Sequence, residues 1–202
     1  MTTPTTIVTG AGTGIGRAIA LRLAAEGHTL GLMARNTERL ENTADSARAA
    51  GAAEVRTYPC DIQDQQAVNH AFAAAHKDLG DLNGLVANSG IGGANSPGPE
   101  DRFVELVQTN LNGTYFCMRA AQAHMSAGPA PRHMVAIASI LGRFGVAGYT
   151  GYCASKTGIL GLVRAMSLEL ADQHIRVNAI CPGWVDTEMA REGIDGMANG
   201  MG

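Results

Sequence analysis

Short apolar segments alternate along the chain with longer stretches in which apolar residues recur every three or four positions. Continuous apolar runs of about four to eight residues are typical of buried strands, whereas the longer period is typical of helices. The pattern predicts six strands, over residues 5–9, 28–34, 54–58, 82–88, 133–138 and 175–180. It predicts helices from 14 to a glycine stop at 27, over 36–50 and 63–79, through a long stretch ending at 125, and over 151–171.

Strands and helices alternate strictly in this pattern, and the strands are continuously apolar. Both features are typical of a parallel sheet whose two faces are covered by helices. Because crossover connections are right-handed, we expect an α/β fold with one doubly wound parallel sheet, formed by a single domain over residues 1–202. Ligands of such sheets bind beyond the carboxyl ends of the strands, so the residues that follow each strand are the candidates for function.

The composition supports a globular domain and argues against several classes of partner. Of the 202 residues, 46% are hydrophobic and 16% are charged, with a formal net charge of −3. Such a chain can bury a substantial core, and it has no basic excess that would favour nucleic acid or an anionic membrane. No apolar run approaches the ~18 residues that a membrane helix needs. Four widely spaced cysteines and six histidines without ligand spacing predict a reduced, cytoplasmic protein with no disulfide framework and no metal site.

The first predicted strand is followed at once by a glycine-rich turn. Its sequence is TGAGTGIG, with glycines at Gly10, Gly12, Gly14 and Gly16. Glycines allow a tight turn and a close approach of the backbone to a pyrophosphate, and the helix that follows offers its free N–H groups. We therefore predict that this turn, including Thr13 and Ile15, binds the phosphates of a dinucleotide. An ordinary glycine-rich connection between a strand and a helix would show the same composition.

The ends of the second and third predicted strands indicate which nucleotide binds. Arg35 follows the second strand, where NAD-binding folds place an acidic residue for the ribose 2′-hydroxyl. An arginine can pair there with a 2′-phosphate, so we predict NADP, with NAD as the alternative; surface arginines without such a role are also common. Asp61 and Ile62 follow the third strand, where they are placed to hydrogen-bond and cover an adenine. Asp61 is an equally good candidate for the N-cap of the next helix.

A serine, a tyrosine and a lysine follow the fifth predicted strand. Ser139 precedes Tyr152 by thirteen residues, and Lys156 lies four residues after Tyr152, on the same face of the predicted helix. A free tyrosine has a pKa of ~10, and a neighbouring ammonium favours its anion. We therefore expect Lys156 to lower the pKa of Tyr152, which would exchange a proton with a substrate oxygen that Ser139 also binds. On its own, a tyrosine–lysine pair at this spacing is more often a solvated helix face.

Taken together, these motifs resemble the classical short-chain dehydrogenases/reductases from residue 5 to about residue 189. The family's TGxxxGIG motif matches residues 9–16, and its NNAG element matches residues 87–90, which depart from the pattern at two positions but keep Asn88 and Gly90. The resemblance implies that these two residues line the adenosine ribose and that Asn110 holds a water in a proton relay. It implies that the serine, tyrosine and lysine are catalytic, and that the lysine also grips the nicotinamide ribose.

The resemblance extends to a PGxxxT element at residues 182–187, which in the family closes over the nicotinamide. The implied cofactor contacts there are Pro182, Gly183, Val185 and Thr187. Trp184 lies between them, and we expect it to shape the substrate pocket, with simple packing as its other possible role. The resemblance also implies that residues from about 187 to 202 begin a mobile substrate-binding segment. The glycine- and proline-rich loop over residues 90–100 is expected to be a mobile active-site loop.

For the whole protein, the resemblance implies an oxidoreductase that transfers a hydride between NADP(H) and a ketone or secondary alcohol. Within the family, the sequence is most similar to 3-oxoacyl-thioester reductases and related ketoreductases. The alternatives are an NAD-dependent alcohol or sugar dehydrogenase and, in a different class, a non-catalytic nucleotide-sensing protein. The resemblance also implies a homo-oligomer, either a tetramer or a dimer. The sequence lacks the family's last helix, seventh strand and tail, so we expect the natural chain to continue past Gly202.

Overall fold

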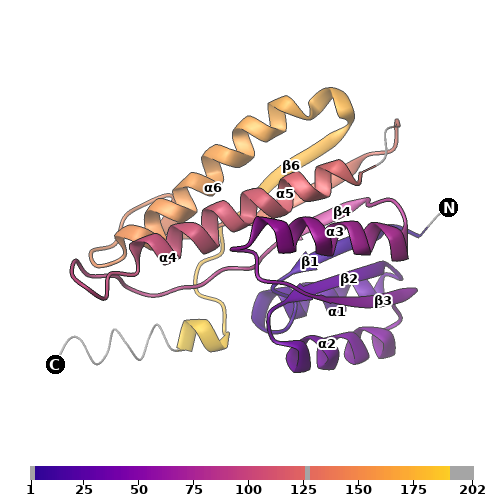
Figure 1. The fold of residues 1–202 in the computed structure, drawn as a ribbon, viewed down its shortest axis with the longest axis horizontal. Helices are drawn as coiled ribbons and strands as arrows, with labels where there is room; N and C mark the ends of the chain where they lie inside the picture. The colour runs from indigo at the N-terminus through magenta and orange to yellow at the C-terminus, as the bar shows by residue number, and fades with distance from the viewer. Residues whose placement is uncertain (1–2, 126–127, 192–202) are drawn as a thin grey trace.

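Short apolar segments form strands, and most of the amphipathic segments between them form longer helices, in the computed structural model, which describes residues 3–125 and 128–191 (Figure 1). The strands are β1 (Thr5–Thr9), β2 (Thr29–Ala34), β3 (Glu54–Pro59), β4 (Gly84–Ala87), β5 (Arg132–Ile137) and β6 (Ile175–Ile180). The helices are α1 (Gly14–Ala25), α2 (Thr37–Ala50), α3 (Gln65–Leu79), α4 (Phe103–Val107), α5 (Gly113–Ala123) and α6 (Thr150–Glu169). Among the described residues, no helix combines the length and the apolarity that are needed to cross a membrane.

The strands form one sheet in the order β3-β2-β1-β4-β5-β6, and every pair is parallel. This order confirms the predicted doubly wound sheet, since the chain first proceeds outward from β1 to β3 and then returns to build the other half from β4. Because all strands run the same way, the segments that follow them meet at one edge of the sheet. The boundary between the two halves lies between β1 and β4, where the loops diverge.

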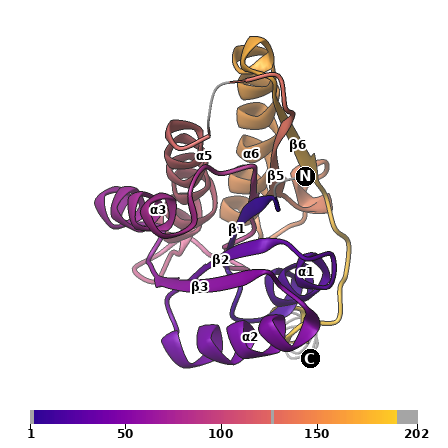
Figure 2. The ribbon, with the colours of Figure 1, turned by 90° about the vertical axis from the view of Figure 1, so that its right-hand side faces the viewer.

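Helices pack on both faces of the sheet and create two separate cores. On one face, α1 and α2 bury small and aliphatic side chains such as Ala20, Leu40 and Ala44 against β1 and β2. On the other face, α3, α5 and α6 cover a larger core that includes Phe72 and Met118. Figure 2 shows α3 and α5 side by side, across the sheet from α1 and α2.

The two faces are not covered equally over the last two strands. In β6 the side chains alternate between buried and exposed, with Arg176 and Asn178 directed to solvent and Ile180 52% exposed. We expected helices over both faces of the whole sheet. Among the described residues, however, only one face of β6 is packed, by α6, and the polar side chains on its other face fit that exposure.

The long helix predicted to end at residue 125 is broken into three pieces. A π-helical turn over Gln108–Asn112 separates α4 from α5. Such turns interrupt the regular hydrogen-bond ladder and occur often at functional sites, because the inserted residue redirects a side chain. Here the turn contains Asn110, which is fully buried. Hydrophobic periodicity does not reveal the break, because apolar residues continue at helical spacing through it.

Candidate active site

The glycine-rich turn between β1 and α1 is built so that only glycine fits at two positions. Gly10 has a φ of +64°, in the left-handed region that disfavours other residues. A Cβ atom on Gly16 would lie 2.2 Å from the carbonyl oxygen of Gly10 and 2.4 Å from Nδ2 of Asn88. The first turn of α1 contains no acidic residue, and its N-cap, Thr13, makes no side-chain capping bond. The turn therefore leaves the N-terminal N–H groups of α1 available to an anion.

The turn is fastened to the loop that follows β4. The Thr9 hydroxyl oxygen accepts hydrogen bonds of 3.0 Å from the backbone N–H groups of Asn88 and Ser89. In return, Nδ2 of Asn88 donates to the carbonyl oxygens of Thr9 (3.0 Å) and Gly10 (3.3 Å). Asn88 therefore holds the turn in shape, a supporting role beside the predicted contact to ribose. The Thr9 side chain, at the head of the glycine-rich motif, was not among the predicted site residues.

A cavity of about 190 Å³ lies between this turn and the ends of β2, β3 and β4. It is lined by several of the residues predicted to bind a dinucleotide, namely Gly10, Gly12, Thr13, Arg35, Asp61, Ile62 and Gly90. The Arg35 guanidinium lies 4.0 Å from the Asp61 carboxylate, and both side chains are largely exposed. Asp61 accepts a hydrogen bond from the backbone of Gln63, whereas the N-cap of α3 is Asp64, so the capping role considered for Asp61 is not the observed one.

The three predicted catalytic side chains come together at the start of α6. Lys156 is 5% exposed; its Nζ donates to the carbonyl oxygen of Ile137, at 3.0 Å, and lies 5.6 Å from the centre of the Tyr152 ring. Ser139 lies two residues after the end of β5; it is hydrogen-bonded to Tyr152, and its hydroxyl oxygen accepts from the N–H of Leu141. The spacing of four residues thus places phenol and ammonium on one face of the helix, toward the end of β5.

Burial dominates the ionisation of this pair. The pKa of Tyr152 is raised above its ordinary value by burial, and its hydrogen bond with Ser139 offsets part of that rise. Burial also lowers the pKa of Lys156 to about 8. The expectation that Lys156 brings the pKa of Tyr152 below that of a free tyrosine is therefore wrong for the chain by itself, because removal from water penalises the phenolate more than its neighbours favour it. The Tyr152 phenol is accordingly protonated at pH 7.

Asn110 is held by its neighbours in a way that explains the π-helical turn. Its Oδ1 accepts from the N–H of Ile91 (2.8 Å), and its Nδ2 donates to the carbonyl oxygen of Ile91 (3.0 Å) and to the Ser155 hydroxyl (3.2 Å). The Ser155 hydroxyl in turn donates to the carbonyl oxygen of Tyr152. Asn110 thus joins the loop after β4 to α6. Ser155, which is fully buried, was not among the predicted site residues, because its link to Asn110 spans 45 residues of sequence.

Gly90 lies close both to the cavity and to the side chains of Asn110 and Lys156. It lines the cavity, and a Cβ atom at this position would lie 3.0 Å from Oδ1 of Asn110 and 3.5 Å from Nζ of Lys156. A larger side chain there would intrude between the cavity and the lysine. The absence of a side chain at Gly90 therefore allows the backbone that lines the cavity to lie close to the Lys156 ammonium.

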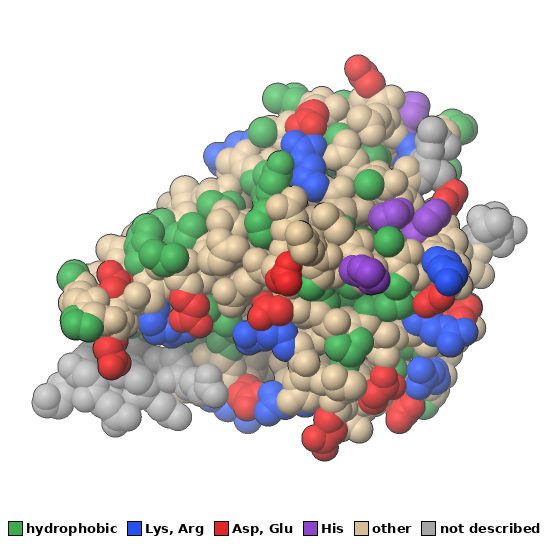
Figure 3. All heavy atoms as spheres, in the orientation of Figure 1, with side chains coloured by type: hydrophobic (Ala, Val, Ile, Leu, Met, Phe, Trp, Pro, Cys, Tyr) green, Lys and Arg blue, Asp and Glu red, His purple; other side chains and the backbone are tan. Residues whose placement is uncertain are grey.

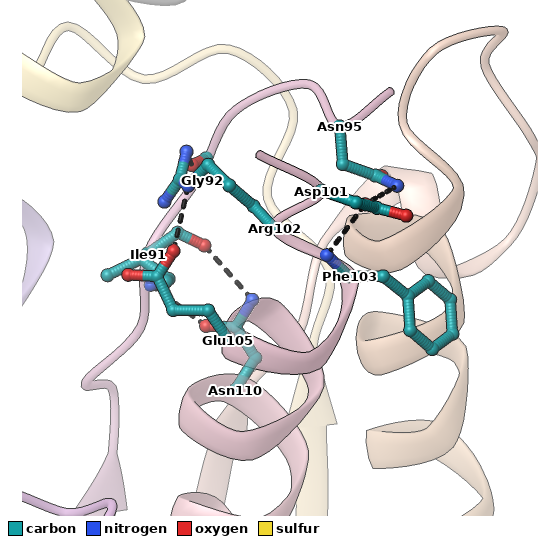
Figure 4. A network of polar contacts seen from close by, with 8 residues as sticks. All are labelled: Ile91, Gly92, Asn95, Asp101, Arg102, Phe103, Glu105 and Asn110. Carbon is teal, nitrogen blue, oxygen red and sulfur yellow. Dashed lines mark hydrogen bonds and ion pairs between the residues drawn. The ribbon is translucent and has the colours of Figure 1, made fainter. Parts of the chain in front are cut away.

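The loop that follows Gly90 is fastened at several points (Figure 4). Asn95 is 7% exposed, and its Nδ2 donates to the Asp101 carboxylate at 2.9 Å, which also accepts from the N–H of Phe103. The Arg102 guanidinium donates to the carbonyl oxygen of Gly92. The composition of this loop is typical of a mobile active-site loop and equally of a plain surface loop; its mobility stays a prediction, and the structure shows side chains that tie it to α4 and α6.

The segment after β6 packs against α1 and α2. Pro182, Val185 and Thr187 line a cavity of about 420 Å³ together with Gly14 and Ile15. Among the described residues, Gly183 and Trp184 line neither cavity, and Trp184 is 66% exposed. The predicted role of Trp184 in the substrate pocket therefore stays a prediction.

Two contacts fix the short helical end of this segment. Glu188 forms a two-pronged ion pair with Arg39 of α2, with N–O distances of 2.8 and 3.3 Å. Met189 lies against Gly92, where an added Cβ would be 3.2 Å from its Cγ and Sδ. The mobile segment was predicted to begin at about residue 187. The structure describes its residues up to 191, and the rest lies outside the described residues.

Comparisons with known proteins agree with this geometry. Residues 4–197 match the family described as short chain dehydrogenase. A ketoacyl reductase of the granaticin polyketide synthase from Streptomyces violaceoruber is 38% identical over 190 residues, which cover 93% of this chain and 70% of that protein.

Solved structures with nicotinamide cofactors share the fold. A variant of the actinorhodin polyketide ketoreductase with NADPH superposes with a TM-score of 0.88 at 33% identity, over 98% of this chain and 76% of that one. An NAD⁺-bound xylitol dehydrogenase superposes with a TM-score of 0.83 at 34% identity, over 90% and 70% of the two chains. With the family match extending over nearly all its residues, this chain belongs to the short-chain dehydrogenases.

Proposed function

We propose that the protein is an NADP(H)-dependent reductase that interconverts ketones and secondary alcohols. The observation that carries the proposal is the position of the Lys156 ammonium, which is buried beside the Tyr152 ring and beside Gly90, a residue that lines the cavity next to the glycine-rich turn. A proton donor and a cofactor site thus adjoin at the carboxyl edge of the sheet. The similarity to ketoacyl reductases supports the same reaction class.

In this proposal, NADPH supplies the hydride when it is bound. The Ser139 and Tyr152 hydroxyls donate hydrogen bonds to the carbonyl oxygen of the substrate, where negative charge develops. Tyr152, which is protonated at pH 7, then transfers its proton to that oxygen. Lys156 stabilises the phenolate that forms, and Asn110 organises the path by which the proton is replaced. The raised pKa of Tyr152 keeps its phenol protonated at pH 7, which is the state that a proton donor needs.

The preference for NADP rests on Arg35. Its guanidinium lines the cavity at the end of β2, where it can form a two-pronged contact with a 2′-phosphate. The Asp61 carboxylate lies 4.0 Å from the same guanidinium. When the cofactor binds, Asp61 would hydrogen-bond the adenine, and the Arg35 guanidinium would then contact the 2′-phosphate. Since related proteins have been solved with either NADPH or NAD⁺, the preference requires a direct test.

Two substitutions test the reaction and the cofactor separately. Tyr152→Phe should lower kcat for carbonyl reduction by about 10²-fold or more while leaving the affinity for NADPH largely unchanged, because it removes the proton donor alone. Arg35→Asp should raise the KM for NADPH sharply and spare NADH. Activity of the Tyr152 variant within a few-fold of wild type would remove the tyrosine from its role, and an equal effect on both cofactors would remove the arginine from its own.

The substrate is proposed to be a 3-oxoacyl thioester or a related ketone, by similarity to ketoacyl reductases. Consumption of NADPH and of NADH should be followed with 3-oxoacyl thioesters, cyclic ketones, quinones and sugars. Preferential turnover of the thioesters would support this substrate class, and turnover of sugars with NADH would favour the alcohol or sugar dehydrogenase alternative. Binding of NADPH without turnover of any carbonyl compound would favour a nucleotide sensor instead.

We also propose that the chain forms a homo-oligomer through the outer surfaces of α4, α5 and α6. These helices expose large apolar side chains, namely Phe103, Val104, Tyr115 and Leu168. Figure 3 shows hydrophobic side chains gathered over α4, while acidic and basic side chains are interspersed over the lower half of that face. Exposed apolar groups of this kind favour burial against a second copy. Sedimentation equilibrium should show a dimer or tetramer that Val104→Glu together with Leu168→Glu dissociates; a monomeric wild type would contradict the proposal.

A further inference from the structure

The helix that carries the proposed catalytic tyrosine lacks a capping side chain of its own. The residue at the N-cap position of α6 is Tyr149, and it makes no side-chain hydrogen bond to the helix. The first N–H groups of a helix need acceptors, and where the chain supplies none locally, another segment or water must do so. Tyr152 lies within this first turn, so whatever supplies the acceptor also determines where the phenol sits.

Asn95 supplies that acceptor from a distant loop. Its Oδ1 accepts from the N–H of Gly151 at 2.8 Å, and the Thr150 hydroxyl is within 3.2 Å of the same oxygen. Its backbone N–H donates to the carbonyl oxygen of Gly148, at 2.8 Å. Asn95 therefore caps α6 across 55 residues of sequence, in the position that a local serine or aspartate usually occupies.

The other end of the Asn95 side chain is fixed by a carboxylate. Its Nδ2 donates to Oδ1 of Asp101, and this is the contact drawn between the two residues in Figure 4. Among the hydrogen-bond partners of the Asn95 side chain, Asp101 is the one that can ionise. The nearby Arg102 guanidinium donates instead to the carbonyl oxygen of Gly92 and to the Glu105 carboxylate. Nδ2 also donates to the Thr150 hydroxyl oxygen, at 3.0 Å. The amide is thus oriented with its oxygen toward the Gly151 N–H and its nitrogen toward Asp101 and the Thr150 hydroxyl.

The same loop also holds Asn110. Ile91, four residues before Asn95, is bonded through both its N–H and its carbonyl oxygen to the Asn110 amide. The segment 91–95 therefore connects two elements that the proposed reaction requires in register, the π-helical turn and the start of α6. A displacement at either end would be transmitted to the distance between Asn110 and Tyr152.

Resting on the proposed function, we propose that Asn95 is a positioning residue for Tyr152: its buried amide, oriented by Asp101, caps α6 and places the phenol for proton transfer. Asn95 touches neither cofactor nor substrate in this assignment. It acts through the start of α6, so its loss should lower kcat rather than the affinity for NADPH. Small displacements of a reacting group can lower rates by as much as about 10²-fold.

The test exploits the polarity of the amide. Asn95→Asp keeps an acceptor for the Gly151 N–H but places a second carboxylate against Asp101, in the contact that is now a hydrogen bond. We expect kcat, expressed relative to wild type at the same pH, to fall about tenfold or more at pH 8 and to recover partly toward pH 5, as the two carboxylates come to share a proton. The double variant Asn95→Asp with Asp101→Asn exchanges the two groups and restores a donor–acceptor pair. It should recover most of the wild-type kcat and lose this acid-dependent recovery.

Two further variants complete the test, one that removes the contacts of Asn95 and one that serves as a control. Asn95→Ala removes both contacts and should lower kcat at every pH, whereas Ser96→Ala, at an exposed neighbouring position, should behave as wild type. Failure of the exchanged pair to recover kcat, although it unfolds at the wild-type temperature, would overturn the proposal. So would an effect confined to the KM for NADPH, or an Asn95→Ala variant with wild-type kcat.

A readout that needs no turnover separates this inference from the proposed function. In protein labelled with ¹³C-tyrosine, the Tyr152 signal is identified by its loss in Tyr152→Phe. Its chemical shift and titration should change in Asn95→Ala and Asn95→Asp and return in the exchanged pair. If wild type reduces no carbonyl compound, the proposed function fails, and the inference is decided by this signal alone: a Tyr152 signal that is identical in all variants would overturn it.

Discussion

Lys156 shows how a single buried charge couples stability to the proposed chemistry. Its ammonium is 5% exposed and donates a hydrogen bond to the Ile137 carbonyl oxygen, and among the described residues it forms no ion pair with a carboxylate. Burial without an acidic partner lowers its pKa to about 8. A lysine in such a place destabilises the fold at neutral pH, because the unfolded chain holds the proton more tightly. Its retention is therefore better explained by function than by packing.

Lys156→Met should stabilise the protein at pH 7 while abolishing reduction. The folded-state pKa lies below that of an unfolded lysine, so wild type gains stability relative to its unfolded chain as the pH rises from about 8 toward 10.5. The variant cannot show this gain. Urea unfolding should find it more stable by up to about 3 kcal/mol at pH 7, with the difference shrinking by pH 10. Lys77→Met, at an exposed position on α3, is the control and should show no such trend.

The rate of reduction should depend on the charge of the same ammonium. Since the pKa of Tyr152 is raised, its phenol stays protonated throughout the neutral range. Lys156, with a pKa of about 8, loses its proton first as the solution becomes alkaline, and the phenolate that forms during reduction then lacks its cation. We therefore expect kcat with NADPH to be level below pH 7 and to decline as the pH rises through about 8. A profile that stays flat to pH 9.5 would exclude this role for the charge.

At the scale of elements, hydrophobic periodicity predicted the strands and most helices, and β1 and β6 have the predicted bounds. Features that depend on remote hydrogen bonds were not predictable. The π-helical turn at Asn110 arises from its bonds to Ile91, and the cap of α6 comes from Asn95, 55 residues before Thr150 in the sequence. Neither feature changes the hydrophobic periodicity of the segment in which it lies.

In the candidate site, too, some features were predictable from the sequence and others were not. Glycine spacing and the interval from Tyr152 to Lys156 identified groups that the fold brings together, because these intervals translate directly into turn and helix geometry. The predicted shift of the Tyr152 pKa had the wrong direction. The spacing of Tyr152 and Lys156 in the sequence does not reveal burial, which depends on how the whole molecule packs. The capping role that the sequence allowed for Asp61 belongs to Asp64, since α3 begins later than predicted.

The contact between α2 and the segment after β6 should influence the choice of cofactor. Arg39 lines the same cavity as Arg35, and Glu188 neutralises it with a two-pronged pair. Glu188→Gln removes that negative charge from the neighbourhood of a 2′-phosphate. We expect the Kd for NADPH to fall severalfold at low ionic strength, with the effect fading as salt is added, and the Kd for NADH to stay unchanged.

A matched control exists in the same segment. Asp186 pairs with Arg191 rather than with Arg39, so Asp186→Asn removes an equal charge without touching the arginine of the cavity. Fluorescence titration of both variants would separate the two cases. Tighter binding of both cofactors by Glu188→Gln, or an equal effect of Asp186→Asn, would show that overall charge or loop closure is responsible instead.

At the scale of the molecule, the strand order assembles the site from segments that are far apart in the chain. The loops after β1, β2 and β3 contribute the glycine turn, Arg35 and Asp61, while those after β4, β5 and β6 contribute Gly90, Ser139 and Thr187. The first set lies on one half of the sheet and the second on the other. A ligand that bridges β1 and β4 therefore joins the two halves directly.

Such a ligand should stabilise the whole fold, because it binds the assembled edge and not the unfolded chain. At a concentration of 100 times its Kd, NADPH should raise the free energy of unfolding by about 2.7 kcal/mol and shift the unfolding temperature accordingly. Adenosine 2′,5′-bisphosphate, which carries the 2′-phosphate but no nicotinamide, should give part of this shift, and 5′-AMP should give less at equal concentration. Thermal unfolding followed by circular dichroism would measure all three. An identical response to the two adenosine nucleotides would mean that Arg35 does not recognise the 2′-phosphate, even if the dinucleotide itself binds.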